Sequence, residues 1–124
     1  MSAADIHFLL TLRNQLKVYH WQTRIYARHV ATDRVLEELD KLIDSYVEVF
    51  IGKYGRPKLD AATRVLRLQT LTEAGATKLV SAAIRHMLGP MVKGLDPAVD
   101  SDLINLRDEM VANLNQLLYL FSLH

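Results

Sequence analysis

The chain contains no cysteine among its 124 residues. Disulfide bonds, thiolate metal sites and cysteine nucleophiles are therefore excluded. Proline and glycine are also scarce, with three and five residues, and no low-complexity run interrupts the sequence. A chain of this length and composition suits one domain with a real hydrophobic core, so we predict a single domain over residues 1–124.

The sequence also lacks a large excess of positive or negative charge, and it lacks long apolar runs. The 15 Lys and Arg residues nearly balance the 14 Asp and Glu residues, which leaves a formal net charge of +1. This balance provides no global field for nucleic acid, which is therefore not an expected partner. No apolar run is long enough for a membrane span, and the first residues lack the regions of a signal peptide. We expect a cytoplasmic protein without a membrane partner.

Apolar residues recur at steps of three and four along most of the chain, which is the period of an amphipathic α-helix. No segment shows the sustained alternation of a strand. Helix starts and stops are marked by capping residues, glycine and proline. The four predicted helices are residues 3–24, residues 26–53, a third that begins at Thr72 and is kinked or ended at Gly89-Pro90, and a fourth that is capped within residues 100–102 and carries its stripe to Phe121.

The connection between the second and third predicted helices is the longest one. It covers residues 54–71, with at most a short turn of helix at residues 60–66. Long amphipathic helices joined by one such connection indicate an all-α fold. We predict a four-helix bundle with a longer crossover connection between helices 2 and 3.

Four side chains of the second predicted helix are arranged almost as a mirror image. Asp33 and Asp44 are equidistant from the point between residues 38 and 39, and so are His29 and Glu48. Each half spans one helical turn, so its two side chains project from about one face. Asp33 and Asp44 are eleven residues apart, or about 16 Å along a helix, so the two halves cannot meet within one chain.

Two copies of this helix that cross antiparallel about a two-fold axis would bring the halves together. His29 and Asp33 of one copy would then face Asp44 and Glu48 of the other. One imidazole and three carboxylates form a ligand set suited to iron or manganese. The alternative is a solvated acidic face, which is common on surface helices. Placement at the edge of the apolar stripe favours ligands, because a carboxylate buried there without a partner is costly.

A further histidine ends the first predicted helix. His20 aligns with Leu9 and Leu16, so we expect it to point inward, and Trp21 follows it directly. An inward histidine is more often a hydrogen-bonded core residue than a ligand. Facing a helix that carries His29, however, it becomes a candidate ligand. The remaining histidines are expected at the surface or in structural roles; they are His7, His86 and His124.

These residues together resemble a known family, the Dps-type miniferritins of the ferritin superfamily. The residues that carry the resemblance are Lys17-Val18-Tyr19-His20-Trp21, His29, Asp33, Asp44, Glu48 and Gly55. Residues 29–48 match the family's spacing without a gap. The interval from His20 to His29 is shorter than in typical members, and Val49 stands where the family usually has Arg.

The resemblance implies a ferritin-like bundle with an iron site at a two-fold dimer interface. The histidines and the first Asp come from one subunit, and the later Asp and Glu come from the other. It also implies oxidation of Fe(II), preferably by hydrogen peroxide, and storage of ferric mineral in a hollow shell. The metal ligands carried over are His20, His29, Asp33, Asp44 and Glu48, with Trp21 beside them.

We therefore predict an iron-binding homo-oligomer, at least a dimer through helix 2, with ferroxidase-like oxidoreductase activity that uses peroxide or oxygen. Two alternatives remain open. In the first, a ferritin-like oligomer has lost the metal and its carboxylates form an interfacial hydrogen-bond network. In the second, the same residues hold zinc or manganese in a stabilising or regulatory role.

Overall fold

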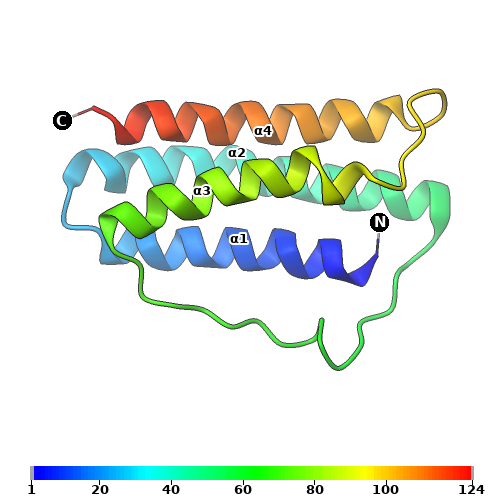
Figure 1. Ribbon diagram of the computed structural model, residues 1–124, viewed down its shortest axis with the longest axis horizontal. Coiled ribbons are helices and arrows are strands. Elements are labelled where there is room, and N and C mark those ends of the chain that lie inside the picture. The colour runs from blue at the N-terminus through cyan, green and yellow to red at the C-terminus, as the bar shows by residue number, and fades with distance from the viewer. Residues whose placement is uncertain (1, 124) are drawn as a thin grey trace.

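The computed structural model describes residues 2–123, and every regular element among them is helical. The prediction of an all-α helical bundle is confirmed. The α-helices lie side by side along the long axis of the molecule (Figure 1). The helices are α1 (Ala3–Gln22), α2 (Tyr26–Tyr54), α3 (Glu73–Leu88) and α4 (Ser101–Phe121), and a short 3₁₀ helix, η1, covers Pro90–Val92.

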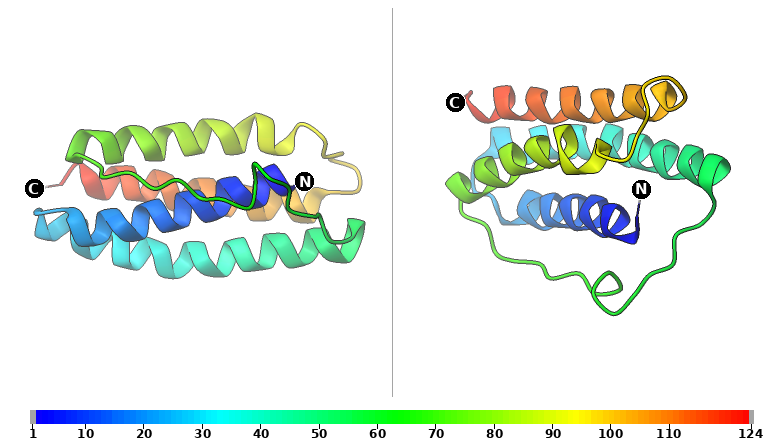
Figure 2. Two further views of the ribbon diagram at one scale, coloured as in Figure 1. Left: turned by 90° about the horizontal axis from the view of Figure 1, so that it is seen from below. Right: turned by 45° about the vertical axis from the view of Figure 1, so that its right-hand side comes forward.

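The chain path contains one short and two longer connections. Residues 23–25 join α1 to α2, which run antiparallel (Figure 1). Residues 55–72, which we call the strap, then return the chain along the outside of α1 to the opposite end (Figure 2). The helices α2 and α3 consequently run in the same direction, and α4 runs back against α3. The long crossover connection predicted between the second and third helices is thus present.

The core lies between the four helices, with α2 packed mainly on α4 and α1, and α3 packed on α4. Its members recur at helical spacing, as the apolar stripes predict, and each large apolar side chain contributes roughly 1.5–3 kcal/mol on burial. Tyr46 is also fully buried, and burial raises the pKa of its phenol to about 12. The largest fully buried side chains include Leu9, Leu16, Tyr19, Leu39, Tyr46, Val80, Met87, Leu103, Met110, Leu114 and Leu117.

The helix ends follow local signals in the sequence. The backbone N–H of Ser2 donates to Asp5 Oδ2 at 3.0 Å, which fixes the start of α1. The Thr72 hydroxyl accepts from the N–H of Gly75 at 2.9 Å and caps α3, as predicted. Gly55, whose φ of +88° suits only glycine well, ends α2.

Two details differ from the sequence prediction. Helix α1 ends at Gln22 rather than at residue 24, because Thr23 is extended and its hydroxyl donates to Glu73 at 2.9 Å. In the strap, residues 61–63 form only a turn. The carboxylate of Asp60 accepts from the backbone there, which stabilises a turn instead of the short helix expected at residues 60–66.

Candidate metal centre

The end of α1 and the start of α2 bring two histidines into contact. The rings of His20 and His29 stack with their centroids 3.9 Å apart and their planes 15° apart. His20 is 6% exposed, whereas His29 is only partly buried. The short loop of residues 23–25 permits this contact because it returns the chain at once along α1. The shortened interval between the histidines therefore does not separate them.

The hydrogen bonds of His20 define which ring nitrogen carries the proton. Its Nδ1 lies 2.9 Å from the hydroxyl oxygen of Thr32. That hydroxyl has one proton, which it donates to the backbone carbonyls of α2, at 2.8 Å for Arg28. With the hydroxyl proton placed in this way, the oxygen accepts from Nδ1–H of His20. In the neutral ring the lone pair then lies on Nε2.

His29 has the same arrangement for a simpler reason. Its Nδ1 lies 2.8 Å from the carbonyl oxygen of His20, and a carbonyl can only accept. Nδ1 is therefore protonated and Nε2 carries the lone pair of the neutral ring. Neither Nε2 atom has a hydrogen-bond partner within residues 2–123. Histidine ligands in metal sites typically have their other nitrogen held in this way.

The surroundings of His20 favour its neutral form. Burial is the largest effect that lowers the pKa of the His20 imidazole, and the neighbouring ring of His29 lowers it further. A metal ion binds only the unprotonated nitrogen, so a lowered pKa keeps the lone pair available at a lower pH. The pair of stacked rings is thus prepared to act as a two-nitrogen ligand.

The predicted carboxylate ligands lie farther along α2. Asp33, Asp44 and Glu48 are all exposed. Asp33 follows His29 by one turn, whereas Asp44 lies about 16 Å beyond Asp33 along the uninterrupted helix. Within residues 2–123, no three His, Asp or Glu side chains converge on a position for a metal ion. One chain alone therefore provides two separate parts and no complete site.

Both parts lie along one surface, which we call the α1/α2 face. Asp44 borders a shallow hollow of about 240 Å³ between the two helices, lined also by apolar residues such as Leu10 and Val47. Nearer the histidines, the Arg13 guanidinium forms two hydrogen bonds to the Asp40 carboxylate, at 2.9 and 3.2 Å. The face is therefore partly apolar, and the Arg13–Asp40 salt bridge lies between the histidine pair and the hollow beside Asp44.

Trp21 also lies on this side of the molecule. Its side chain is 68% exposed, and the ammonium group of Lys17 lies 5.3 Å from the centre of its ring. Leu10 is 43% exposed on the same helix. Large apolar side chains exposed on one face are frequently found where another molecule packs.

A second polar cluster adjoins the histidines but is closed. We call it the Glu73 network. The phenol of Tyr19 and the hydroxyl of Thr23 both donate to the Glu73 carboxylate. The Arg28 guanidinium donates to the Tyr19 oxygen at 2.9 Å, to the Glu73 carbonyl at 2.7 Å, and lies over the ring of Phe121 at 4.3 Å. These groups connect all four helices at one end of the bundle and satisfy one another.

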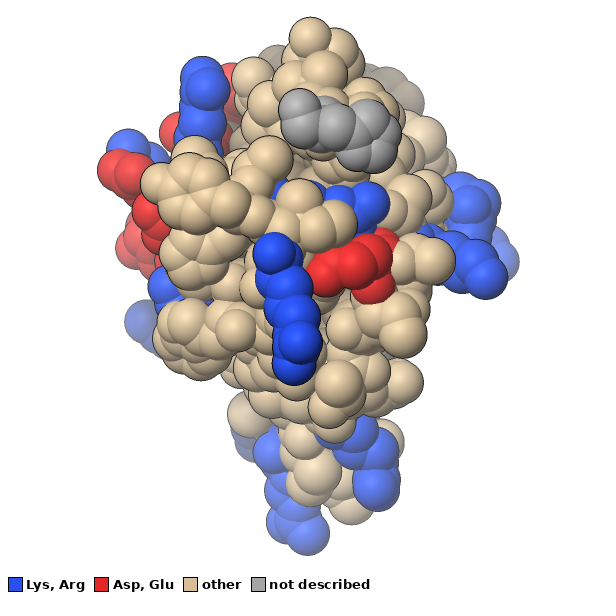
Figure 3. All heavy atoms as spheres, turned by 90° about the vertical axis from the view of Figure 1, so that its left-hand side faces the viewer, with Lys and Arg blue, Asp and Glu red and all other residues tan. Residues whose placement is uncertain are grey.

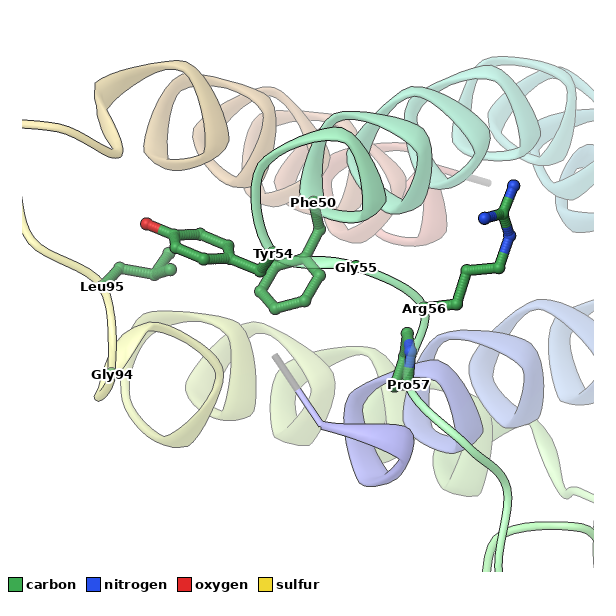
Figure 4. Close-up of a pocket in the computed structure, with 7 residues that line it drawn as sticks. All are labelled: Phe50, Tyr54, Gly55, Arg56, Pro57, Gly94 and Leu95. Carbon is green, nitrogen blue, oxygen red and sulfur yellow. The ribbon is translucent and has the colours of Figure 1, made fainter.

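The opposite end of the bundle contains a hollow of about 350 Å³ (Figure 4). Its lining includes the rings of Phe50 and Tyr54, whose centroids are 5.0 Å apart. The Tyr54 hydroxyl is already engaged by the buried Asp100 carboxylate, and Arg56 extends away from the two rings (Figure 4). No set of free polar groups converges on this hollow, so it offers little specificity for a ligand.

The other described histidines lie outside this pair, and His86 Nε2 is buried without a hydrogen-bond partner, 3.9 Å from Asp5 Oδ1. His7 donates from Nε2 to the carbonyl of Val65 at 2.7 Å, and His86 stacks on Phe8 with ring centroids 4.0 Å apart. His124 lies outside the described residues. Thr32, which holds His20, was not identified from the sequence. In the sequence, a threonine within an apolar stripe that hydrogen-bonds a ligand cannot be distinguished from one that only packs in the core.

Comparison with known proteins adds a family. Residues 20–121 match a family of unknown function, DUF5856. The chain belongs to this family. It is also 30% identical over 124 residues to an uncharacterised 14.6 kDa protein in the mobD–ri intergenic region of Enterobacteria phage T4, with 98% of this chain and 90% of that protein covered. No solved structure matches the chain.

The matched range contains all five predicted ligands, since it begins at His20 and continues past Glu48. Among the residues described, no helix has the length and apolar character needed to cross a membrane.

Proposed function

We propose that this protein is a Dps-like iron-binding protein that oxidises Fe(II) at sites completed by a second copy of the chain. The observation that carries the proposal is the stacked pair of His20 and His29. Both rings are held through Nδ1–H and both keep a lone pair on Nε2, and Asp33 follows His29 by one turn of α2. Nothing else in the described chain combines donor atoms of this kind.

The second copy would supply the missing ligands by symmetry. Because α2 is one uninterrupted helix of 29 residues, the separation of its two ligand pairs is fixed. In an antiparallel crossing near residue 38, the histidines and Asp33 of one copy would meet Asp44 and Glu48 of the other. Two equivalent sites would result, as expected of an isologous dimer. The single long crossover between α2 and α3 is also the connection that ferritin-like bundles use.

The chemistry follows from the donor set. Two neutral imidazole nitrogens and anionic carboxylates bind Fe(II), and the carboxylates favour the more highly charged Fe(III). Two ferrous ions would each give up one electron. One hydrogen peroxide would take up both electrons and two protons and leave as two waters; with oxygen as oxidant, four ferrous ions and four protons give the same products. Trp21, directly after His20, could supply an electron to a stray oxidising equivalent.

Ferrous titration followed by absorbance of the ferric product tests the proposal. We expect the wild-type protein to oxidise Fe(II) faster than buffer, and Asp44→Ala and Glu48→Ala to lose this acceleration. Glu37→Ala is the matched control, because Glu37 is an exposed carboxylate of α2 outside the ligand set. Oxidation no faster than in buffer, by protein with intact helical circular dichroism, would refute the proposal.

A mixing experiment tests whether the site is shared between chains. His29→Ala lacks one half of each site and Asp44→Ala lacks the other, so each variant alone should be inactive. After unfolding and refolding together in equal amounts, half of the dimers contain both variants and have one complete site. Activity should then recover to about a quarter of the wild-type value. Absence of recovery would show that both halves act within one chain or that the dimer differs.

The same donors also suit another metal. Imidazole nitrogens are good ligands for zinc, and the two anchored rings favour a zinc or manganese site with a stabilising role as the second candidate. Thermal stabilisation by these ions, without accelerated iron oxidation, would support it through linkage between binding and folding. Less than one bound ion per dimer after metal supplementation would instead indicate a helical oligomer without a metal function.

A further inference from the structure

The strap combines exposed cations with exposed aliphatic side chains in a regular way. Three times, a cation is followed directly by an aliphatic residue. The side chains of Leu59, Val65 and Leu68 are 58%, 45% and 45% exposed. Exposed aliphatic side chains that recur within one short segment are more informative than single ones scattered over a surface. The three couples are Lys58-Leu59, Arg64-Val65 and Arg67-Leu68.

The strap projects from the bundle. It lies beneath α1 in Figure 1 and forms the lowest part of the molecule in both orientations that show it from the side (Figures 1 and 2). Seen from one end, this lower projection carries Lys and Arg among uncharged residues (Figure 3). Within residues 2–123, the side chains of Lys58, Arg64 and Arg67 form neither ion pairs nor hydrogen bonds. The cations are therefore free for an external partner.

The projection is nevertheless held in place. The side-chain amide of Gln15 donates to the carbonyl of Gln69 at 2.6 Å and accepts from its N–H at 2.8 Å. His7 holds the carbonyl of Val65. Asp60, the single acid of the strap, turns its carboxylate onto its own backbone, where hydrogen bonds from Thr63 lower its pKa. An ordered surface loses less conformational entropy on binding than a free tail would.

We propose that the strap docks this protein on an anionic membrane surface. Residues 55–72 contain four cations, which are Arg56 and the three in the couples, and one anion, Asp60. This segment therefore has a net charge of +3 (four minus one), although the chain as a whole carries +1. Anionic headgroups attract such clustered cations. Leu59, Val65 and Leu68, next to the cations, can enter the boundary between headgroups and acyl chains.

The alternative polyanion, nucleic acid, is less well matched. Single-stranded nucleic acid is usually bound by aromatic side chains that stack on bases, and residues 55–72 contain no aromatic residue. A convex projection also fits a deformable flat surface better than it fits a groove. The proposal departs from the expectation of no membrane partner, which rested on whole-chain charge and on the absence of a span. It does not depend on the metal site.

Sedimentation of the full-length protein with lipid vesicles tests the proposal. We expect binding to vesicles of phosphatidylcholine with phosphatidylglycerol, little binding to phosphatidylcholine alone, and weaker binding at high salt. Arg64→Ala with Arg67→Ala should weaken binding roughly 30-fold, since each cation near the surface is worth about fivefold in affinity. Lys78→Ala with Arg85→Ala is the matched control, because both are exposed cations on α3.

Leu59→Ser with Leu68→Ser separates this mode from plain electrostatic attraction. We expect this variant to bind anionic vesicles more weakly at high salt, where the apolar contact contributes most. The proposal is overturned if wild-type protein does not sediment with anionic vesicles, or if the control pair weakens binding as much as the strap pair. It is also overturned if a DNA or RNA oligonucleotide of matched charge is bound while the vesicles are not.

Discussion

Two pairs of residues that are adjacent in the sequence take part in different clusters of this molecule. Tyr19 and Arg28 belong to the Glu73 network, whereas His20 and His29, each one residue later, form the stacked pair. One step along a helix turns a side chain by about 100°, so adjacent residues project to different surfaces. The same two helix ends thus build a closed cluster inside the bundle and an open one on the α1/α2 face.

The comparison separates polar groups that stabilise a fold from those free to bind. In the Glu73 network every charged group has several partners, and Arg28 is largely buried among them. In the histidine pair only Nδ1 of each ring is used. Partly buried groups whose lone pairs remain unpaired tend to be associated with ligands, whereas groups fully paired with one another are mostly structural.

The largest expected effect lies in the closed cluster. Arg28→Ala removes hydrogen bonds to Tyr19 and Glu73 and the contact with the Phe121 ring. It should lower the free energy of unfolding by about 3 kcal/mol, because it also leaves polar partners unpaired. Urea denaturation measures this loss, with Arg24→Ala in the preceding loop as an exposed control. A loss below about 1 kcal/mol would show that the network is not structural.

Substitutions at the stacked histidine pair should change the affinity for metal ions. Thr32→Val removes the acceptor that holds His20 Nδ1–H, and it should weaken zinc or cobalt binding by about tenfold or more. Thr32→Ser keeps a hydroxyl and should retain most of the affinity. Calorimetric titration of both variants, beside their urea midpoints, distinguishes ligand positioning from general destabilisation. Equal affinities for valine and serine would mean that the anchor is irrelevant.

The pH dependence of stability should also distinguish the two clusters. Burial alone would raise the pKa of Glu73, but hydrogen bonds from Tyr19 and Thr23 outweigh it and lower the pKa below 4.5. The stabilisation is therefore present above the unfolded-state value near 4.5 and is lost as the pH falls through the lower folded-state value. Glu73→Gln should be less stable than wild type at neutral pH. The difference in urea midpoint should shrink in acid, because the carboxylates shared by both proteins, including Asp100, cancel.

The smallest effect on stability is expected for Trp21. Its side chain is 68% exposed, so Trp21→Phe should change the free energy of unfolding by less than about 0.5 kcal/mol. As the single tryptophan of the chain, it reports on the neighbouring histidines. Cobalt should quench its fluorescence in the wild type and leave it unchanged in His29→Ala. Equal quenching in both would indicate a metal bound elsewhere.

Much of the fold could be predicted from local patterns. The four helices, the caps at Ser2 and Thr72, and the end of α2 at Gly55 depend on residues close together in the sequence. Helix α1 was predicted two residues too long because the partner of Thr23, Glu73, is 50 residues away. The long connection was also predicted, although its attachment to α1 through Gln15 and Gln69 was not.

The candidate site also has features that could be predicted from the sequence and features that could not. The spacing of His29, Asp33, Asp44 and Glu48 is visible in the sequence, and the helix preserves it. The interval between His20 and His29 did not indicate that their rings stack, because the stacking depends on how the three-residue loop returns the chain. The contribution of Thr32 could not be predicted either, since its hydrogen bond to His20 connects two helices.

The helices and the mirror spacing of the candidate ligands follow from the order of the residues, because hydrophobic period, capping and rise per residue are local properties. Which nitrogen of each histidine is free depends on the packing of the helices, since the carbonyl and hydroxyl that hold Nδ1 come from contacts across helices. The exposure of the cations and aliphatic side chains of the strap also depends on packing. Packing of the remaining chain leaves the strap outside the core, and no local pattern contains that information.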